Sequence, residues 1–358
     1  MPLVLRCDSV LIWTILSLSM FGLLMVYSAT AAFEQSSTLY ITKQLVAAAI
    51  GFAGMYSLMF IDYRRLRNER IVYGILGGCV FLLLLAAAMG TGANTRRFLR
   101  LGVLSLQPSE LAKPATILFL AWYLERNRHM LHRFSSLGVP FAVIGTLSAL
   151  ILIGKDFGTT ACLGILAGTM LFLAGAPLRH LFLCVVPAIP LAYLLVWQVQ
   201  YRRARIFAFL DPDADPLGSG FQILQSQIAV GSGGWIGQGW MAGKQKMHFL
   251  PEVHTDFIFA MVAEELGLLG AMLVVAAFGL FLWRGLRSAL GAPDQLGVYL
   301  AAGVTVMVVT QVMLNMGVVL GLLPTKGMPL PFISYGGSSL MTTLASSGVL
   351  LNISRFGR

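Results

Sequence analysis

The sequence predicts an all-α polytopic membrane protein with about ten transmembrane helices, and two observations carry that prediction. Of the 358 residues, 57% are hydrophobic and only 11% are charged, and the mean hydropathy of +0.80 lies outside the range of soluble domains. Most apolar runs also reach the roughly 18 residues that mark a membrane-spanning helix, and none alternates as barrel strands do. We therefore expect one transmembrane domain over residues 1–358.

Ten apolar segments account for the expected helices. They lie near residues 10–32, 40–61, 71–89, 108–124, 137–154, 157–175, 180–201, 256–283, 296–323 and 337–354. The first segment ends in SATAA, which resembles the cleavage site of a signal peptide. Its apolar run is longer than a typical signal core and long enough to span, so we expect an uncleaved first helix.

Arginine-rich loops fall on one side of the membrane when the ten spans alternate. These loops carry Arg64, Arg65, Arg67, Arg70, Arg126, Arg128, Arg133, Arg179, Arg284, Arg287 and Arg355. Excess Lys and Arg mark cytoplasmic loops, so this side and both termini are expected to be cytoplasmic. The same excess accounts for the formal net charge of +10, which therefore gives no reason to expect nucleic-acid binding. The extracytoplasmic side then carries a long polar loop, residues 202–255, between the seventh and eighth spans.

Cations also occur on the predicted extracytoplasmic side, where the topology rule does not favour them. They include Arg97, Lys155, Lys244 and Lys326. Membrane lipid headgroups or the acids of the long loop would pair with them in a purely structural reading. An anionic ligand is the alternative. The sequence favours the ligand, because the cations lie beside the motifs that follow.

The long loop ends in LPEVHTDFIFAMVAEELGLLG, which places Asp256 where an apolar helix begins. A helix that starts near Thr255 and runs inward would hold Asp256 in its first turn, at the outer membrane face. An acid there complements the helix dipole, with Thr255 as the cap, and this role is purely structural. The polar loop and the neighbouring Glu252 and His254 favour a functional role instead.

Two further acids follow on the same predicted helix. Glu264 and Glu265 would lie about 12–14 Å below Asp256 at a rise of about 1.5 Å per residue. Adjacent acids at that depth must find partners or stay protonated. We expect them to be structural hydrogen-bond acceptors.

Charged residues also occur inside the fourth span, in the motif QPSELAKP. Glu110 and Lys113 are three residues apart and therefore share a helix face. A self-satisfied ion pair is the structural interpretation, but charges within a span usually face a bundle interior or a wet cavity. Pro114 would open the local hydrogen-bond ladder and could kink this helix toward such a cavity.

Two more motifs lie between predicted spans. In GKDFGTT, Lys155 and Asp156 occupy a tight turn between the fifth and sixth spans, where an ordinary surface loop would serve as well. The prolines and glycines of residues 315–339 predict irregular, re-entrant backbone with Lys326 at its tip, which is tolerated only where it lines protein or water. The lack of a GxxxxGK[ST] motif argues against an ATP-driven pump.

Taken together, these stretches resemble the SEDS family (shape, elongation, division and sporulation). The matching stretches are RRFLRLG with QPSELAKP, KDFGTT, DPDADPLGSGFQILQSQIAVGSGGWIGQG, LPEVHTDFIFAMVAEELGLLG and NMGVVLGLLPTKGMPLPFISYGGSS. They extend from the third loop to the last helix, so the resemblance covers nearly the whole chain. Within the family, the short N-terminus resembles the RodA branch more than the FtsW branch. In one departure, the family commonly reads RW where this chain has Arg97 and Phe98, which keeps an aromatic surface.

The resemblance implies a glycosyltransferase that polymerises lipid II into glycan strands at the outer face of the cytoplasmic membrane, during cell-wall elongation and shape maintenance. It also implies ten transmembrane helices and a class B penicillin-binding protein as partner, a transpeptidase that crosslinks the new strand. By the match to the family motifs, Asp256 is essential for polymerisation, and Glu110 and Lys113 line the same cavity.

The residues suit this chemistry. Polymerisation joins a sugar hydroxyl of one lipid II to the anomeric carbon of another and expels a lipid pyrophosphate. A carboxylate can accept the hydroxyl proton and cations can stabilise the leaving group, so Asp256 is the candidate general base. A helix N-terminus would stabilise its charged form and make it a weaker base. The candidate substrate-binding residues are Glu110, Lys113, Arg97, Lys155, Asp156, Lys244 and Lys326.

A metal and two other functions stay open at this point. A divalent cation, Mg²⁺ or Mn²⁺, could bridge the pyrophosphate to Asp256, Asp156 or Glu110. A flippase or transporter for lipid-linked precursors would use the same cavity, cations and broken helices without making a bond. A scaffold for cell-wall enzymes would show no turnover at all.

Overall fold

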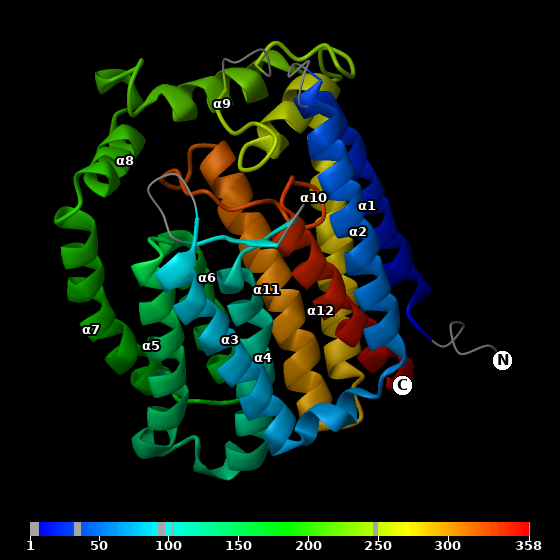
Figure 1. Cartoon of the computed structure of the whole chain (residues 1–358), viewed down its shortest axis with the longest axis vertical. Helices are drawn as coiled ribbons and strands as arrows, with labels where there is room; N and C mark the ends of the chain where they lie inside the picture. The colour runs from blue at the N-terminus through cyan, green and yellow to red at the C-terminus, as the bar shows by residue number, and fades with distance from the viewer. Residues whose placement is uncertain (1–6, 32–36, 92–96, 102–103, 246–249, 358) are drawn as a thin grey trace.

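The computed structural model describes residues 7–31, 37–91, 97–101, 104–245 and 250–357, mostly as helices (Figure 1). The long elements are α1 (Ser9–Thr30), α2 (Ser37–Phe60), α3 (Glu69–Met89), β1 (Leu99–Leu101), β2 (Leu104–Leu106), α4 (Pro108–Asn127), α5 (Gly138–Ile153), α6 (Phe157–Leu173), α7 (Leu178–Trp197), α8 (Gln200–Leu210), α9 (Phe221–Ser232), α10 (Ile258–Leu290), α11 (Gln295–Val319) and α12 (Gly337–Phe356). Short 3₁₀ helices cover Tyr63–Arg67, Arg128–Met130, Phe134–Leu137 and Pro212–Ala214.

Each of the ten predicted spans coincides with a helix, namely α1 to α7 and α10 to α12. Within the described residues, six helical segments are long and apolar enough to cross a membrane. The chain is therefore a multi-pass, mainly helical membrane protein, and the count of ten spans stays a prediction. α4 and α12 are more polar because they carry buried Glu, Lys, Ser and Thr side chains.

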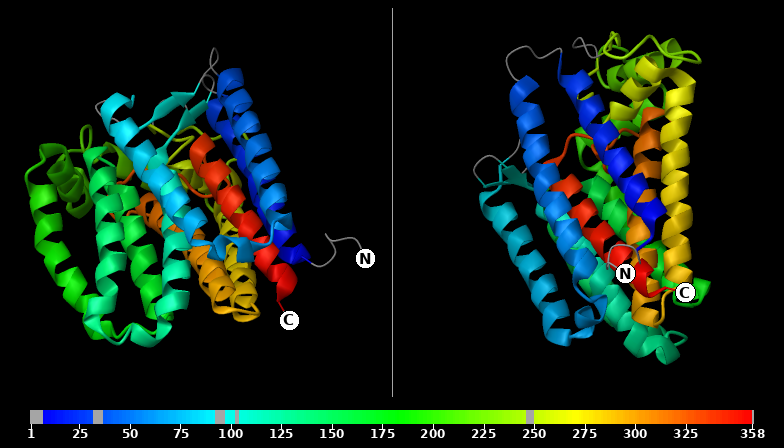
Figure 2. Two further views of the ribbon diagram at one scale, coloured as in Figure 1. Left: turned by 60° about the horizontal axis from the view of Figure 1, so that its bottom comes forward. Right: turned by 90° about the vertical axis from the view of Figure 1, so that its right-hand side faces the viewer.

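The two ends of the bundle differ as the alternation of spans requires. The segments that join α2 to α3, α4 to α5 and α10 to α11 lie at the same end as the start of α1 and the end of α12 (Figures 1 and 2). Ion pairs link the elements at this end: Arg67 lies 2.6 Å from Glu125 and 3.1 Å from Asp294, and Arg284 lies 2.7 Å from Asp8. Which side of the membrane this end faces stays a prediction.

The opposite end contains regular structure that the sequence analysis did not anticipate. β1 and β2 form a small antiparallel hairpin, with Leu99 opposite Leu106, so the chain is not purely α-helical. The predicted long loop contains α8, at the upper left of the bundle above α7, and α9, which lies across the top (Figure 1). α11 runs through the centre and packs against α4, α6, α10 and α12.

α10 is broken at Gly267, and this break overturns the predicted direction of the helix. Gly267 has φ 68° and ψ −167°, a conformation that interrupts a helix and favours glycine. The part before Gly267 rises to the loop after α9, and the part after it descends to the opposite end (Figure 1). The carbonyl groups of Glu264 and Glu265 accept the N–H groups of Gln238 and Gly239 in that loop, at 3.0 Å each.

Glu264 and Glu265 therefore do not lie on a helix that descends from Asp256, as the sequence analysis expected. Their role as hydrogen-bond acceptors is confirmed. Glu264 Oε1 accepts the N–H of Lys244 at 2.7 Å. Glu265 Oε1 accepts the hydroxyl of Ser28 at 2.8 Å, and its Oε2 accepts the N–H of Met241 at 3.1 Å. Both acids are fully buried and hold the loop that follows α9 against α1 and α10.

Candidate active site

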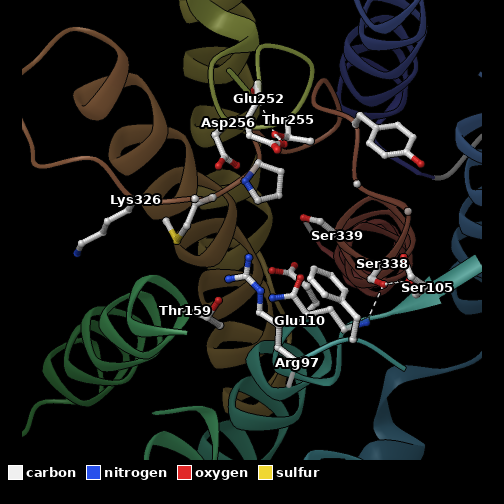
Figure 3. Close-up of a pocket in the computed structure, with 18 of the residues that line it drawn as sticks. Arg97, Ser105, Glu110, Thr159, Glu252, Thr255, Asp256, Lys326, Ser338 and Ser339 are labelled. Carbon is white, nitrogen blue, oxygen red and sulfur yellow. Dashed lines mark hydrogen bonds between the residues drawn. The ribbon is translucent and has the colours of Figure 1, made fainter. Parts of the chain in front are cut away.

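A cavity of about 860 Å³ lies beneath α8 and α9, at the ends of α4, α6 and α12. The irregular segment 320–336, predicted as re-entrant backbone, forms part of its wall. The charged residues that line it are Lys43, Arg97, Arg100, Arg205, Lys326, Glu110, Glu252 and Asp256. Asp256, Glu252 and Thr255 lie on one wall, and Glu110 and Arg97 lie on the opposite wall (Figure 3).

The turn before α10 positions Asp256. Glu252 adopts a left-handed conformation, with φ 56°. Its carbonyl oxygen accepts the N–H groups of Thr255 and Asp256 at 3.1 Å and that of Phe257 at 3.4 Å. The Thr255 hydroxyl also donates to this carbonyl, at 3.1 Å, and α10 begins only at Ile258, with no side-chain cap. The predicted placement of Asp256 in the first helical turn, capped by Thr255, is therefore wrong.

Two neighbours fix where the Asp256 carboxylate lies. The amide Nδ2 of Asn315 donates to the carbonyl oxygen of Asp256 at 2.8 Å and to that of Met328 at 2.7 Å, which ties the turn to segment 320–336. A Cβ atom at Gly327 would lie only 2.8 Å from Asp256 Oδ2. Glycine at position 327 therefore allows the backbone of this segment to approach the carboxylate closely.

The surroundings of Asp256 make it a stronger base than a surface carboxylate. Burial, together with the negative charge of Glu252, raises the pKa of Asp256 to about 7, although the positive charges of Arg97 and Arg205 oppose the shift. The expectation that a helix dipole would keep Asp256 ionised and weakly basic is therefore wrong, because the residue precedes the helix. Near neutral pH the carboxylate can accept a proton from a ligand hydroxyl.

A buried polar network forms the floor beside Glu110. Lys113 Nζ lies 2.8 Å from Glu110 Oε2, and the two side chains are 4% and 5% exposed. The same ammonium donates to Gln311 Oε1 at 2.7 Å. Gln311 Nε2 in turn donates to the Pro329 carbonyl at 2.8 Å. The predicted ion pair is present, and through Gln311 it connects α4 to α11 and to the cavity wall.

Asp156 lies outside the cavity, and both of its carboxylate oxygens have partners. Oδ1 accepts the Thr159 N–H at 3.1 Å, which caps α6. Oδ2 accepts the hydroxyl groups of Thr159 at 2.9 Å and Ser109 at 2.8 Å, and the amide of Gln107 at 2.9 Å. Asp156 thereby holds the start of α6 against the start of α4. The predicted tight turn is present, with Lys155 exposed at φ 61°.

The four predicted cationic ligands outside α4 have different locations. Arg97 and Lys326 line the cavity, whereas Lys155 and Lys244 are exposed and do not. The guanidinium of Arg97 lies 5.3 Å from the ring centre of Phe98, so phenylalanine does keep an aromatic contact at this position. The ammonium of Lys326 lies 5.9 Å from the ring centre of Phe157.

The family of the chain follows from a comparison with known proteins. Residues 9–358 match the family model FtsW/RodA/SpoVE, described as "cell cycle protein". The chain belongs to this family. A relative from Geobacter metallireducens, named probable peptidoglycan glycosyltransferase FtsW, is 44% identical over 98% of this chain and 95% of its own length. Stage V sporulation protein E of Bacillus subtilis is 41% identical over 98% of each chain.

Solved structures agree with this assignment. One belongs to a study titled "Structural coordination of polymerization and crosslinking by a peptidoglycan synthase complex", with TM-score 0.81, 33% identity and 98% coverage of both chains. The rod shape determining protein RodA of Thermus thermophilus has TM-score 0.73 and 29% identity, over 98% of this chain and 97% of its own. Both curated relatives bear FtsW or sporulation names, so membership of the RodA branch stays a prediction.

Several cavity residues of this FtsW/RodA/SpoVE-family protein were not among the candidate site residues of the sequence analysis. Lys43 lies in the apolar α2, where a lone cation is costly, and that isolation is a signal that could have found it. Arg100 lies in β1, which was not predicted. Ser338 accepts the Gln107 N–H at 2.9 Å and donates to the Ser105 carbonyl at 2.7 Å, which joins α12 to the hairpin (Figure 3).

The described residues of this family member contain no group of three or more His, Cys, Asp or Glu side chains that could hold a metal ion. Hard divalent cations prefer several oxygen ligands. Of the three acids considered for a bridging cation, Asp156 is already engaged by four donors and Glu110 is paired with Lys113. A cation beside Asp256 would therefore find neither Asp156 nor Glu110 free to bind it.

Proposed function

We propose that this protein is a peptidoglycan glycosyltransferase that polymerises lipid II at the outer face of the cytoplasmic membrane, during cell-wall elongation and cell-shape maintenance. The observation that carries the proposal is Asp256, a carboxyl group with a pKa of about 7 that faces a cavity lined by five cations. The peptidoglycan glycosyltransferase name of the Geobacter relative supports the same activity.

In the proposed reaction, a sugar hydroxyl of one lipid II attacks the anomeric carbon of a second. Asp256 accepts the hydroxyl proton as the new carbon–oxygen bond forms. The bond between the anomeric carbon and the diphosphate breaks, and its electron pair moves to the diphosphate oxygen. Cations such as Arg97 stabilise the charge that develops there. Glu110 and Lys113 hold the cavity floor, and the diphosphate leaving group supplies the driving force without ATP.

A class B penicillin-binding protein is the proposed partner. The solved complex that resembles this chain couples polymerisation with crosslinking according to its title. A strand made on the extracytoplasmic side would be available to a transpeptidase on that side. We expect the purified partner to raise the rate of polymerisation or the length of the product strands.

A precursor transporter is the main competing function, and proteoliposomes can separate the two. Vesicles that contain the protein and fluorescent lipid II would be assayed both for glycan strands and for movement of lipid II between leaflets. Samples with Mg²⁺, with Mn²⁺ and with a chelator would show whether a divalent cation is required. Strands of repeating disaccharide support the proposal. Movement between leaflets without strands would assign the cavity to transport.

The raised pKa of Asp256 predicts a pH-dependent rate. Only the ionised carboxylate accepts a proton, so turnover should rise between about pH 6 and pH 8, with its midpoint near 7. Glu252→Gln removes a negative charge that raises this pKa and should move the midpoint to lower pH. Initial rates measured in buffers of constant ionic strength test both statements. A flat profile over this range would contradict the assignment of the base.

Gly327→Ala is expected to lower turnover while leaving the fold intact. The added methyl group would meet Asp256 Oδ2 at 2.8 Å, so the carboxylate would have to rotate away from its position. A misplaced catalytic group costs on the order of 10²-fold in rate. Gly164→Ala in α6, where the methyl group meets no atom within 4 Å, is the matched control. Equal rates for both variants would show that this contact does not position Asp256.

A further inference from the structure

The cavity cations come from two separate parts of the fold. Arg97 lies two residues before β1 and Arg100 lies within β1, so both belong to the hairpin side of the cavity. Arg205 lies on α8, and Lys326 lies on segment 320–336. Arg205 Nη1 donates to the carbonyl oxygen of Thr325 at 3.3 Å, which places Arg205 beside Lys326. We call the first pair the hairpin cations and the second pair the α8 cations.

Within the part of the chain that the structure describes, no residue of either pair forms an ion pair with an acid. The ion pairs there involve other residues, and the cavity acid Glu110 is taken by Lys113. Arg97 Nε is buried and donates a hydrogen bond to no partner among the described residues. Burial lowers the pKa of Lys326. Cations in such surroundings are stabilised when an anion binds beside them.

Asp256 is close to both pairs. Arg97 of the hairpin cations and Arg205 of the α8 cations each stabilise its ionised form electrostatically, although they come from different elements. Lys326 and Arg97 extend from different walls, and Asp256 lies on a third side (Figure 3). An anion at either pair would therefore lie on its own side of the base.

We propose that the hairpin cations and the α8 cations are two separate diphosphate subsites, one for each of the two lipid-linked substrates of the reaction. The inference rests on the proposed function, because each of the two lipid II molecules carries a diphosphate and only one of them is expelled. Two diphosphates repel each other strongly at short distance, so both fit one cavity only if separate cations hold them apart. A hydroxyl of one substrate then meets the anomeric carbon of the other beside Asp256.

Two substrate analogues separate the subsites experimentally. A lipid-linked disaccharide that lacks the attacking hydroxyl can act only as donor. A second analogue, with a carbon–phosphorus bond at its anomeric centre, cannot lose its diphosphate-like group and can act only as acceptor. Together they form a single glycosidic bond. The KM of each analogue would be measured for Arg97→Gln/Arg100→Gln and for Arg205→Gln/Lys326→Gln, with melting temperatures as a check on folding.

We expect one double variant to raise the KM of one analogue at least tenfold, with less than a twofold effect on the other. The second double variant should show the opposite pattern. Arg203→Gln is the matched control, because Arg203 lies on α8 but does not line the cavity. The two-subsite inference is wrong if both double variants raise the KM of the same analogue. It is also wrong if either double variant leaves the KM of both analogues unchanged.

Binding measurements keep this test independent of turnover. The affinity of each analogue would also be measured with the same substitutions placed in an Asp256→Asn background. Suppose that the wild-type protein joins the analogues and that both double variants raise the KM of the same analogue. This result would refute the two subsites and leave the proposed function standing. If the wild-type protein does not join the analogues, the proposed function is refuted. The affinities of the two analogues for the double variants would still show whether there are two anion subsites.

Discussion

Asp256→Asn is expected to abolish glycan polymerisation while substrate binding persists. The amide has nearly the same shape as the carboxylate, so the contact of Asn315 with the Asp256 carbonyl and the space beside Gly327 are preserved. An amide cannot accept the hydroxyl proton, and loss of a general base costs roughly 10²- to 10⁴-fold in rate. Product strands would be measured on gels, and lipid II affinity by a separate binding assay.

The matched control for this variant is Asp213→Asn. Asp213 also lies between α7 and α10, is exposed and does not line the cavity. It should polymerise at the wild-type rate. Normal strand formation by Asp256→Asn would remove Asp256 from the mechanism, whereas a loss of binding would make it a substrate ligand rather than a base.

Lys113→Met is expected to destabilise the protein strongly. It removes the partner of Glu110, whose side chain is only 5% exposed. Breaking a buried ion pair from one side costs about 3–5 kcal/mol, because the remaining charge is left without a partner. It also removes the donor to Gln311, which contacts the Pro329 carbonyl in the cavity wall. Melting temperature in detergent and polymerisation rate should therefore fall together.

A double variant separates the charge effect from the packing effect. In Glu110→Gln/Lys113→Met no charge is left buried, and neutral replacement of a whole ion pair is often tolerated. The double variant should recover much of the lost melting temperature. If it is as unstable as Lys113→Met, the cost arises from packing around α4 and not from the unpaired carboxylate.

The sequence predicted the helical segments well because long apolar runs leave few alternatives in a membrane. All ten predicted spans coincide with helices. The spacing of Glu110 and Lys113 also predicted their ion pair, since residues three apart share a helix face. The prolines and glycines of segment 320–336 correctly indicated irregular backbone at the cavity. These features depend on local sequence alone.

Features that depend on contacts between distant segments were missed. The apolar run after Asp256 indicated one continuous helix, but Gly267 breaks it, and its backbone packs against the loop after α9. The predicted ionisation of Asp256 failed because burial in the folded protein raises its pKa, and because α10 begins at Ile258 and not near Thr255. Lys43 and Arg205 reach the cavity from α2 and α8, and only the packing of those helices brings them there.

The most direct test of the central claim is to incubate the purified wild-type protein with lipid II in detergent and to count its products. Our account predicts glycan strands of increasing length on a gel, with one lipid diphosphate released for each glycosidic bond formed. No strands under any condition, with or without a divalent cation and with or without a class B penicillin-binding protein, would contradict it.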